Sequence, residues 1–512
     1  MDGAGFRSLI VFLLLAILAF IAGSLASENA VGALAPTAIV LGLFFLIYLG
    51  KNCWVLVFIV PPVLNEVNLS FLKGFPVPYL VCGVVLFYML ILYMMGYIKI
   101  KWNGILMIDV ITLVFCLYFV STYIRHPVTL NVLTSITDYG YAEVGGKEYL
   151  FLVACMLSYL ALSIVSVKFD TLLKTLKWAF LISAFFVFFN TLRGVMTGSI
   201  TLGDEVSNSR FGAFAGIGQL TFRYLLAKYS FMGVVLSPVK LVIVIVSLLA
   251  LLLSGFRTLL ISSVFYSFAI TCIYKQLFVF IMMGMFVWGG FVYISHEAEE
   301  FVESLPFGIQ RALSVIPGVV VSEKAAREAK QSSEWRLEMW KWAMDPSTGY
   351  IKDYVWGDGY GRSMYVEKLR TTALSLGIIR EDNKIFAARG LWHNGAIHLI
   401  HRLGYVGLSI VYIWNIIILI YIYRLCCYLR PIEGKEYIYI IFVPVFEAAV
   451  TVWFLPTESI VFICRLYEVA LYKIIYLSFK DAYPMLIPDS RTKYTPQIFH
   501  ELNQSDKIMR IS

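Results

Sequence analysis

About fourteen apolar runs, most of them long enough to cross a lipid bilayer, recur along this chain of 512 residues. A bilayer core takes ~20 apolar residues per helix, and backbone polar groups in lipid must find their partners within the protein. The sequence lacks the short alternating strands of a barrel. It therefore predicts an all-α polytopic membrane protein with about 12 to 14 transmembrane helices. The runs are 8–26, 31–49, 53–64, 75–98, 104–124, 149–167, 176–192, 216–236, 239–253, 258–274, 277–294, 396–425, 437–455 and 459–477.

Composition narrows the class of protein further. Hydrophobic residues make up 60% of the chain and charged residues only 14%. The net charge of +8 comes from lysines and arginines that lie mostly in short links between apolar runs. Membrane topology explains this placement, so we expect membrane lipids and no nucleic acid as partners. All eight cysteines lie in or beside apolar runs, which argues against a disulfide framework and a cysteine metal site.

The basic links predict the orientation of the spans. They recur at every second link between successive runs and so share one side of the membrane, which by the positive-inside rule is cytoplasmic. Both termini then lie inside, and the run 8–26 is a retained helix rather than a signal peptide. The predicted divisions are transmembrane helices over 1–294, an extracytoplasmic loop over 295–394, transmembrane helices over 395–480 and a cytoplasmic tail over 481–512.

The long polar loop carries several local signals. Ser332 or Ser333 is a suitable N-cap for a helix that runs through Ala343 and ends before Pro346. Three glycines in WGDGYG predict a tight turn, and a second short helix is expected over 367–376. Asn394 is a plausible cap for the next span.

Three arginines on the predicted outer side are candidates for binding an anion. Arg257 follows Ser-Gly-Phe at the end of an apolar run, Arg336 lies in EWRLEMWKWA, and Arg210 lies in SRFGAF. Each also has a simpler interpretation. These are interfacial snorkelling for Arg257, a solvated amphipathic face for Arg336 and an ordinary loop cation for Arg210.

The segment LWHNGAIHLIHRLGYVG contains three histidines. His393 stands at a helix start, where a histidine is more often a local hydrogen-bonding group than a catalyst. The positive end of a helix would nevertheless keep its imidazole neutral and available as a base. His398 and His401 share a helix face, a spacing that suggests metal binding. We disfavour it because no acidic residue or cysteine is near in sequence and Arg402 would repel a cation.

Several of these motifs together resemble one family, the O-antigen ligase and polymerase superfamily of bacterial membrane glycosyltransferases. The resemblance rests on the arginine after SGF, on WRLEMWKWA followed by WGDGYG, and on HN opening a helix that continues as LGYVG. It covers roughly 210–407, where SRFGAF is also similar to an arginine and glycine segment of the family. The chain has GIGQ where family members commonly have a proline and asparagine pair, so no role is carried over to that stretch.

The resemblance implies a GT-C-like bundle with a large, mainly helical periplasmic loop in the bacterial inner membrane. It implies transfer of a glycan from a lipid-linked, polyprenyl diphosphate donor to a hydroxyl of lipid-A core or another glycan. Arg257 and Arg336, with Arg210 as a weaker third, would bind the donor diphosphate. His393 would be the general base of an inverting displacement. No carboxylate cluster stands out in the outer loops, so no metal or other cofactor is expected.

The tryptophans of the loop, namely Trp335, Trp340 and Trp392, are candidates for stacking on sugars, although an interfacial aromatic belt explains most such residues. Two other functions stay open. A polymerase of the same superfamily would use the same donor with a different acceptor. A transporter or flippase for a lipid-linked glycan would use charges inside the spans, which are Asp109, Arg223, Lys228, Glu447 and the Arg465 and Glu468 pair. We expect these charges to face the bundle interior. We find no internal repeat that would favour a transporter.

Overall fold

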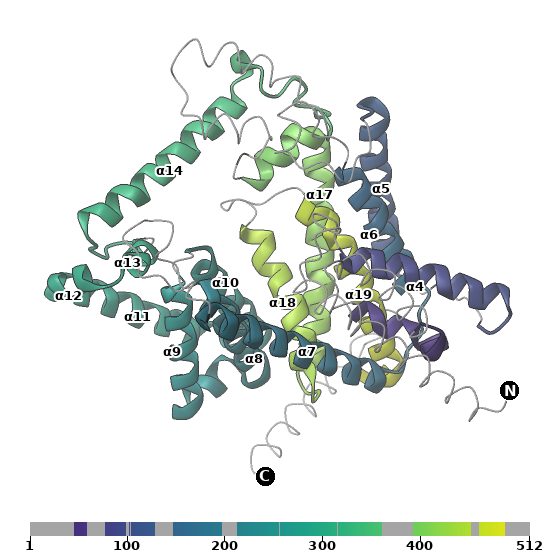
Figure 1. Ribbon diagram of the computed structural model, residues 1–512, viewed down its shortest axis with the longest axis horizontal. Coiled ribbons are helices and arrows are strands. Elements are labelled where there is room, and N and C mark those ends of the chain that lie inside the picture. Colours follow the sequence, from purple (N-terminus) through teal and green to yellow (C-terminus); the bar gives the residue numbers. More distant parts are fainter. Residues whose placement is uncertain are drawn as a thin grey trace, which may run out of the picture.

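A computed structural model gives the structure of this protein. It describes residues 46–58, 77–98, 102, 104–128, 147–196, 212–254, 257–314, 316–360, 392, 394–451 and 460–486. Within these ranges every regular element is a helix, as predicted (Figure 1). The runs predicted at 8–26 and over most of 31–49, and the tail beyond 486, lie outside the described residues.

Among the described residues, eight helices precede residue 275 in the sequence and nine follow it. The first group is η1 (Gly50–Val55), α4 (Val77–Met94), α5 (Leu106–Arg125), α6 (Lys147–Ser163), α7 (Phe169–Met196), α8 (Gly212–Val235), α9 (Pro238–Leu253) and α10 (Arg257–Ile273). The second is α11 (Leu277–Glu297), α12 (Glu299–Ser304), α13 (Phe307–Leu313), α14 (Glu323–Met344), η4 (Pro346–Thr348), α17 (Gly395–Leu429), α18 (Lys435–Thr451), α19 (Ile460–Ala482) and η5 (Pro484–Leu486).

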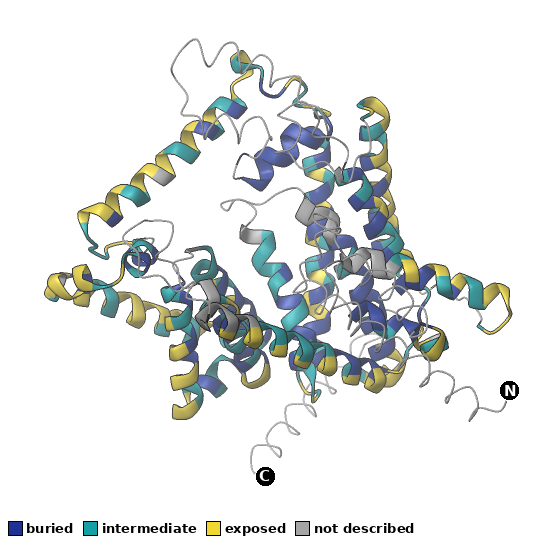
Figure 2. Ribbon diagram, in the orientation of Figure 1, coloured by how far each residue is buried: buried dark blue, intermediate teal, exposed yellow. Residues whose placement is uncertain are grey.

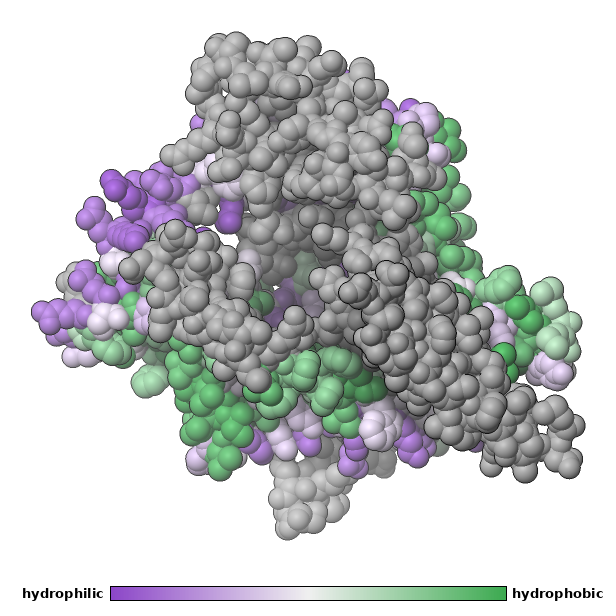
Figure 3. Space-filling view, viewed as in Figure 1, coloured by the Kyte–Doolittle hydropathy of each residue, from purple (hydrophilic) through white to green (hydrophobic). Residues whose placement is uncertain are grey.

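Four of the described helices are long and apolar enough to cross a membrane, which indicates a multi-pass membrane protein. They are Leu106–Arg125, Phe169–Phe189, Leu277–Glu297 and Gly395–Leu429. Exposed apolar side chains support this conclusion. On α11, Phe278 is 75% exposed and Phe286 is 78% exposed. Hydrophobic residues also gather on the flanks of the molecule in Figure 3. Such surface is unfavourable in water and suited to lipid.

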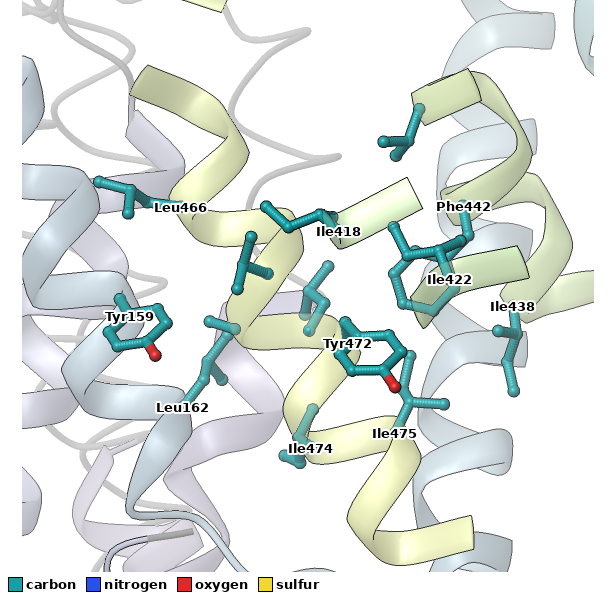
Figure 4. Close-up of a cluster of buried hydrophobic side chains, with 14 of the residues drawn as sticks. Tyr159, Leu162, Ile418, Ile422, Ile438, Phe442, Leu466, Tyr472, Ile474 and Ile475 are labelled. Atoms are coloured by element: carbon teal, nitrogen blue, oxygen red, sulfur yellow. The ribbon is translucent and has the colours of Figure 1, made fainter. Parts of the chain in front are cut away.

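The buried core lies where the C-terminal helices meet α6. Figure 4 shows Leu162 of α6, Ile422 of α17, Phe442 of α18 and Ile475 of α19 in one cluster. Each of these side chains is at most 1% exposed. Helices that are far apart in the sequence therefore share one close-packed interior, as the dark ribbons of Figure 2 also show.

One buried charge pair lies among α5, α6 and α19. The Nζ atom of Lys473 is 2.6 Å from Oδ1 of Asp109 and donates to the Ser163 hydroxyl at 2.9 Å. The Tyr159 hydroxyl also donates to Asp109. Lys473 is 0% exposed, so an unpaired ammonium there would be strongly destabilising. The expectation that Asp109 faces the interior is met, and the partner is a lysine that the sequence analysis did not single out.

The amphipathic helix of the polar loop begins earlier than predicted. Its expected N-cap was Ser332 or Ser333, whereas α14 begins at Glu323 directly after Ser322. Residues 323–332, which precede Ser333, are mostly alanine, glutamate and lysine, and these are strong helix formers. Ser333 instead donates its hydroxyl to the carbonyl of Ala329 inside the helix, at 3.0 Å. The predicted end before Pro346 is confirmed, and the helix predicted over 367–376 lies outside the described residues.

The long helix α17 is broken at Gly404, whose φ of 68° and ψ of −178° are not helical. A break frees backbone groups that must be hydrogen-bonded elsewhere. The glycine turn, defined here as residues 353–360, supplies these partners. The hydrogen bonds are Asp358 N to His401 O (2.8 Å), Gly359 N to Arg402 O (3.0 Å), Tyr405 N to Tyr354 O (2.8 Å) and Val406 N to Val355 O (3.2 Å).

Glycine is required on both sides of this contact. Gly357 has a φ of 81° and Gly404 a φ of 68°, values that favour glycine. A Cβ atom on Gly357 would overlap the backbone of Gly404, and one on Gly404 would overlap the Val355 carbonyl. The two chain segments therefore approach each other more closely than side chains allow. This contact ties the polar loop to α17.

Replacing Gly404 by alanine tests the contact. Gly404→Ala forces an essentially glycine-only backbone conformation, which alone costs ~1–3 kcal/mol, and adds a backbone overlap. We expect a clearly lower thermal unfolding midpoint for the purified protein in detergent. Gly289→Ala in α11 is the matched control, because nothing lies within 4 Å of its Cβ position. Equal midpoints for the two variants would contradict the tight contact.

Candidate functional site

The candidate site is built around the start of α17, next to the predicted base. His393 itself lies outside the described residues, but both of its chain neighbours are described. Asn394 caps α17, because its Oδ1 accepts from the N–H groups of Ala396 (2.9 Å) and Ile397 (3.1 Å). The cap predicted from the sequence is thus confirmed.

Trp392, on the other side, is only 1% exposed. Its indole Nε1 donates to Nδ1 of His401 at 3.1 Å, and its carbonyl accepts from Nε1 of Trp340 at 2.7 Å. Its ring packs edge-on against Tyr350, with centroids 5.3 Å apart. The indole, its backbone carbonyl and its ring face therefore all have protein partners. Trp340 packs beside this cluster from α14, so the polar loop and the start of α17 are joined here.

His401 lies between Trp392 and the glycine turn. Its Nε2 is 3.7 Å from Oδ2 of Asp358, longer than a hydrogen bond but within reach of electrostatic attraction. Asp358 accepts from the N–H groups of Lys352 (2.9 Å) and Asp353 (3.0 Å). Burial raises the pKa of Asp358, while these two N–H donors act in the opposite direction. The sequence analysis raised His401 only as a metal ligand and missed its contact with Trp392.

Arg402, the next residue of α17, also contacts the glycine turn. Its Nη1 donates to the carbonyl of Gly359 at 3.2 Å, and its guanidinium lies 5.7 Å from the centroid of Tyr360. Tyr118 of α5 donates its hydroxyl to the carbonyl of Leu403 at 2.6 Å. The start of α17, the glycine turn and α5 therefore form one connected structure.

Arg336 projects from α14 as a half-buried cation. Within the part of the chain that the structure describes, its buried Nε atom has no hydrogen-bond partner. Burial lowers the pKa of Arg336, and the charge of Arg311 lowers it further. A guanidinium with an unsatisfied N–H beside a second guanidinium favours a bound anion.

Arg311 comes from α13 and was not singled out from the sequence. It forms an ion pair with Glu328 of α14, with Nη1 and Oε1 2.9 Å apart. Helix α13 packs against α14, α9 and α10, and α10 begins at Arg257. The structure thus connects the helices that carry Arg336 and Arg257 through α13. The side chain of Arg257 and the whole of Arg210 lie outside what is described.

A second polar group lies within the bundle on α8, α10 and α18. Arg223 Nη2 is 2.6 Å from Oε2 of Glu447 and donates to the Ser262 hydroxyl at 3.1 Å. Ser262 also donates to Glu447. These charges are paired and partly buried, as expected. Lys228 differs, since it is exposed and donates to the Tyr224 hydroxyl at 3.2 Å. Lys228 lies two residues before Ser230, whose φ of 62° and ψ of 171° interrupt α8.

Among the described residues, no group of three or more histidines, cysteines and acidic residues is arranged to hold a metal ion. No protein-family model matches the chain, and no curated protein matches it significantly. Over the described residues, the structure thus shows an all-α protein with helices suited to a membrane. Sugar contacts by Trp335, Trp340 and Trp392 remain predictions.

The Trp340 hydrogen bond offers a test of how α14 is held. Trp340→Phe keeps an aromatic ring but removes the donor to the buried Trp392 carbonyl. Leaving such a group unsatisfied costs ~1–3 kcal/mol. We expect a lower thermal unfolding midpoint than for Trp356→Phe, the matched control at a residue that is 48% exposed. A Trp340→Phe protein as stable as this control would argue against the docking of α14 on Trp392.

Proposed function

We propose that the protein is a membrane glycosyltransferase that moves a glycan from a polyprenyl diphosphate carrier to an acceptor sugar hydroxyl, in the manner of an O-antigen ligase. The observation that carries the proposal is Arg336, a half-buried guanidinium with an unpartnered Nε beside Arg311. The motif resemblance supplies the reaction class.

A diphosphate leaving group suits these cations. Guanidinium groups stay charged even when partly buried, and they bind phosphate oxygens in a bidentate manner. Arg336 and Arg257, with Arg210 as a weaker third, would stabilise the charge that develops as the sugar to phosphate bond breaks. In this proposal the arginines take the part that a metal ion takes in other phosphate chemistry.

His393 would act on the acceptor. The acceptor oxygen attacks the anomeric carbon while the bond from that carbon to the phosphate oxygen breaks, and the bonding electrons leave with the diphosphate. His393 removes the hydroxyl proton, and the anomeric configuration inverts. Its place directly before the cap of α17 supports this role, because the N-terminal end of a helix disfavours a charged imidazole.

The proposed setting is the bacterial inner membrane. The polar loop over 295–394 would face the periplasm, both termini would lie in the cytoplasm, and the bundle would contain about 12 to 14 transmembrane helices. Partners would be a lipid-linked oligosaccharide donor, a lipid-A core or glycan acceptor, and membrane lipids. The motifs favour a transferase over the alternative of a flippase for the same donor.

Alanine variants test the transferase. Removing one donor to the developing charge lowers kcat by about 10²–10³-fold in well-studied oxyanion sites. We expect Arg336→Ala, Arg257→Ala and His393→Ala each to abolish measurable glycan transfer from polyprenyl diphosphate while the protein reaches the membrane at its normal level. Arg327→Ala, an exposed arginine on the same helix α14, is the matched control and should retain activity. Full activity of Arg336→Ala would refute the proposed donor site, and full activity of His393→Ala would refute the base.

The glycan phenotype of a deletion strain separates the two candidate enzymes. Long glycan chains that remain on the carrier indicate a ligase, whereas single repeat units indicate a polymerase. The two share the donor and the chemistry, and only the acceptor differs.

A further inference from the structure

Helix α13 lies beside α14 and brings a second arginine to the helix that carries Arg336 (Figure 1). Arg311, in the last turn of α13, pairs with Glu328 of α14. The side chains of this pair are 19% and 27% exposed. By comparison, Lys330 and Glu334 form a surface pair on α14 with side chains 76% and 62% exposed. Water therefore screens Arg311 and Glu328 less, and their charges act more strongly on a neighbouring ion.

Only one oxygen of the Glu328 carboxylate is used. Its Oε1 atom is 2.9 Å from Nη1 of Arg311, whereas Oε2 is buried and has no hydrogen-bond partner among the described residues. An arginine that serves to join two helices can bind both carboxylate oxygens through parallel N–H groups. A buried carboxylate oxygen without a partner is unfavourable. A stronger anionic partner for Arg311 can therefore displace Glu328.

Arg336 has an unsatisfied group of the opposite kind. Its Nε atom is buried and donates no hydrogen bond within the residues that the structure describes. Arg336 follows Glu328 by eight residues on α14, about 12 Å along the axis and less than a quarter turn around it. Helical side chains lean toward the N-terminus of their helix, which brings the Arg336 guanidinium nearer to Glu328. Burial lowers the pKa of Arg336 and the charge of Arg311 lowers it further, so the two guanidinium groups lie within electrostatic range.

We propose that Arg311 and Arg336 together bind the two phosphate groups of the donor diphosphate, and that Glu328 pairs with Arg311 when no diphosphate is bound. The inference rests on the proposed function, which supplies the diphosphate. Two neighbouring cations repel each other, and an anion between them relieves this repulsion. On binding, Arg311 exchanges the carboxylate of Glu328 for a phosphate group. When the carrier diphosphate leaves, Glu328 pairs with Arg311 again and weakens rebinding of the product.

The affinity for inorganic pyrophosphate tests the part of Glu328, measured by calorimetry on the purified full-length protein in detergent. Glu328→Gln keeps the size of the side chain and removes the competing charge, so we expect a Kd at least about tenfold lower. Glu334→Gln is the matched control, because it makes the same charge change at the exposed pair and should alter the Kd by less than about twofold. An unchanged or higher Kd for Glu328→Gln would overturn the inference. A higher value would mean that Glu328 orients Arg311 instead of competing for it.

The part of Arg311 is measured in the Glu328→Gln background, where no carboxylate is left unpaired. Adding Arg311→Gln should raise the Kd for pyrophosphate at least about tenfold, because one phosphate group loses its guanidinium. Adding Arg327→Gln instead removes the same charge from an exposed position of α14 and should change the Kd by less than about twofold. Equal Kd values for the two double variants would overturn the inference.

Arginine labelling of the parent protein covers the case in which a variant does not fold. Phenylglyoxal modifies guanidinium groups, and peptide mass spectrometry reports the rate at each site. We expect pyrophosphate to slow the labelling of Arg311 and Arg336 several-fold and to leave Arg327 unchanged. Inorganic phosphate has a single phosphoryl group and should need about tenfold higher concentration for the same protection. Labelling of Arg311 that ignores pyrophosphate would overturn the inference. Equal protection by phosphate would also overturn it and would indicate a site for one phosphate group, such as a lipid headgroup.

These measurements separate the inference from the proposed function. If the parent and its variants bind pyrophosphate as expected but the parent transfers no glycan, the proposed transferase fails and the diphosphate site stands. If glycan transfer depends on Arg336 while Glu328→Gln leaves the Kd for pyrophosphate unchanged, the transferase stands and the inference fails.

Discussion

Backbone groups freed by the break in α17 are the constraint on which the rest of this structure depends. The carbonyls of His401, Arg402 and Leu403 and the N–H groups of Tyr405 and Val406 all need partners at this point. Each would cost several kcal/mol if left unsatisfied in an apolar setting. The glycine turn and Tyr118 satisfy them. The polar loop is consequently part of the helix bundle rather than a separate appendage.

Much of the architecture was predictable because it depends on local patterns. Apolar runs predicted the helices, Asn394 predicted the cap of α17, and Pro346 predicted the end of α14. The start of α14 predicted at Ser332 or Ser333 was wrong because the nine strong helix formers over 323–331 extend the helix back to Ser322. The partner of Asp109 was missed for another reason. Lys473 is 364 residues away, and no local pattern relates two such positions.

In the candidate site, too, local features were predictable from the sequence and long-range contacts were not. Arg336 was selected from its motif, and the structure adds a half-buried environment and the neighbouring charge of Arg311. The glycines of WGDGYG predicted a turn but not its contact with Gly404. A glycine in a sequence indicates an unusual backbone conformation or a close approach, but not which segment lies against it. His401 is the clearest case. Its spacing suggested a metal ligand, whereas its Nδ1 accepts the indole proton of Trp392.

The most direct test of this account is hydrogen–deuterium exchange of the glycine turn. The N–H groups of Asp358 and Gly359 donate to carbonyls of α17, although both lie in a segment without regular helix. We expect peptides covering 353–360 to exchange at least about 100-fold more slowly than unprotected amides, because these bonds open only when the turn leaves α17. Exchange at the rate of an exposed loop would contradict the claim that the turn completes the broken helix.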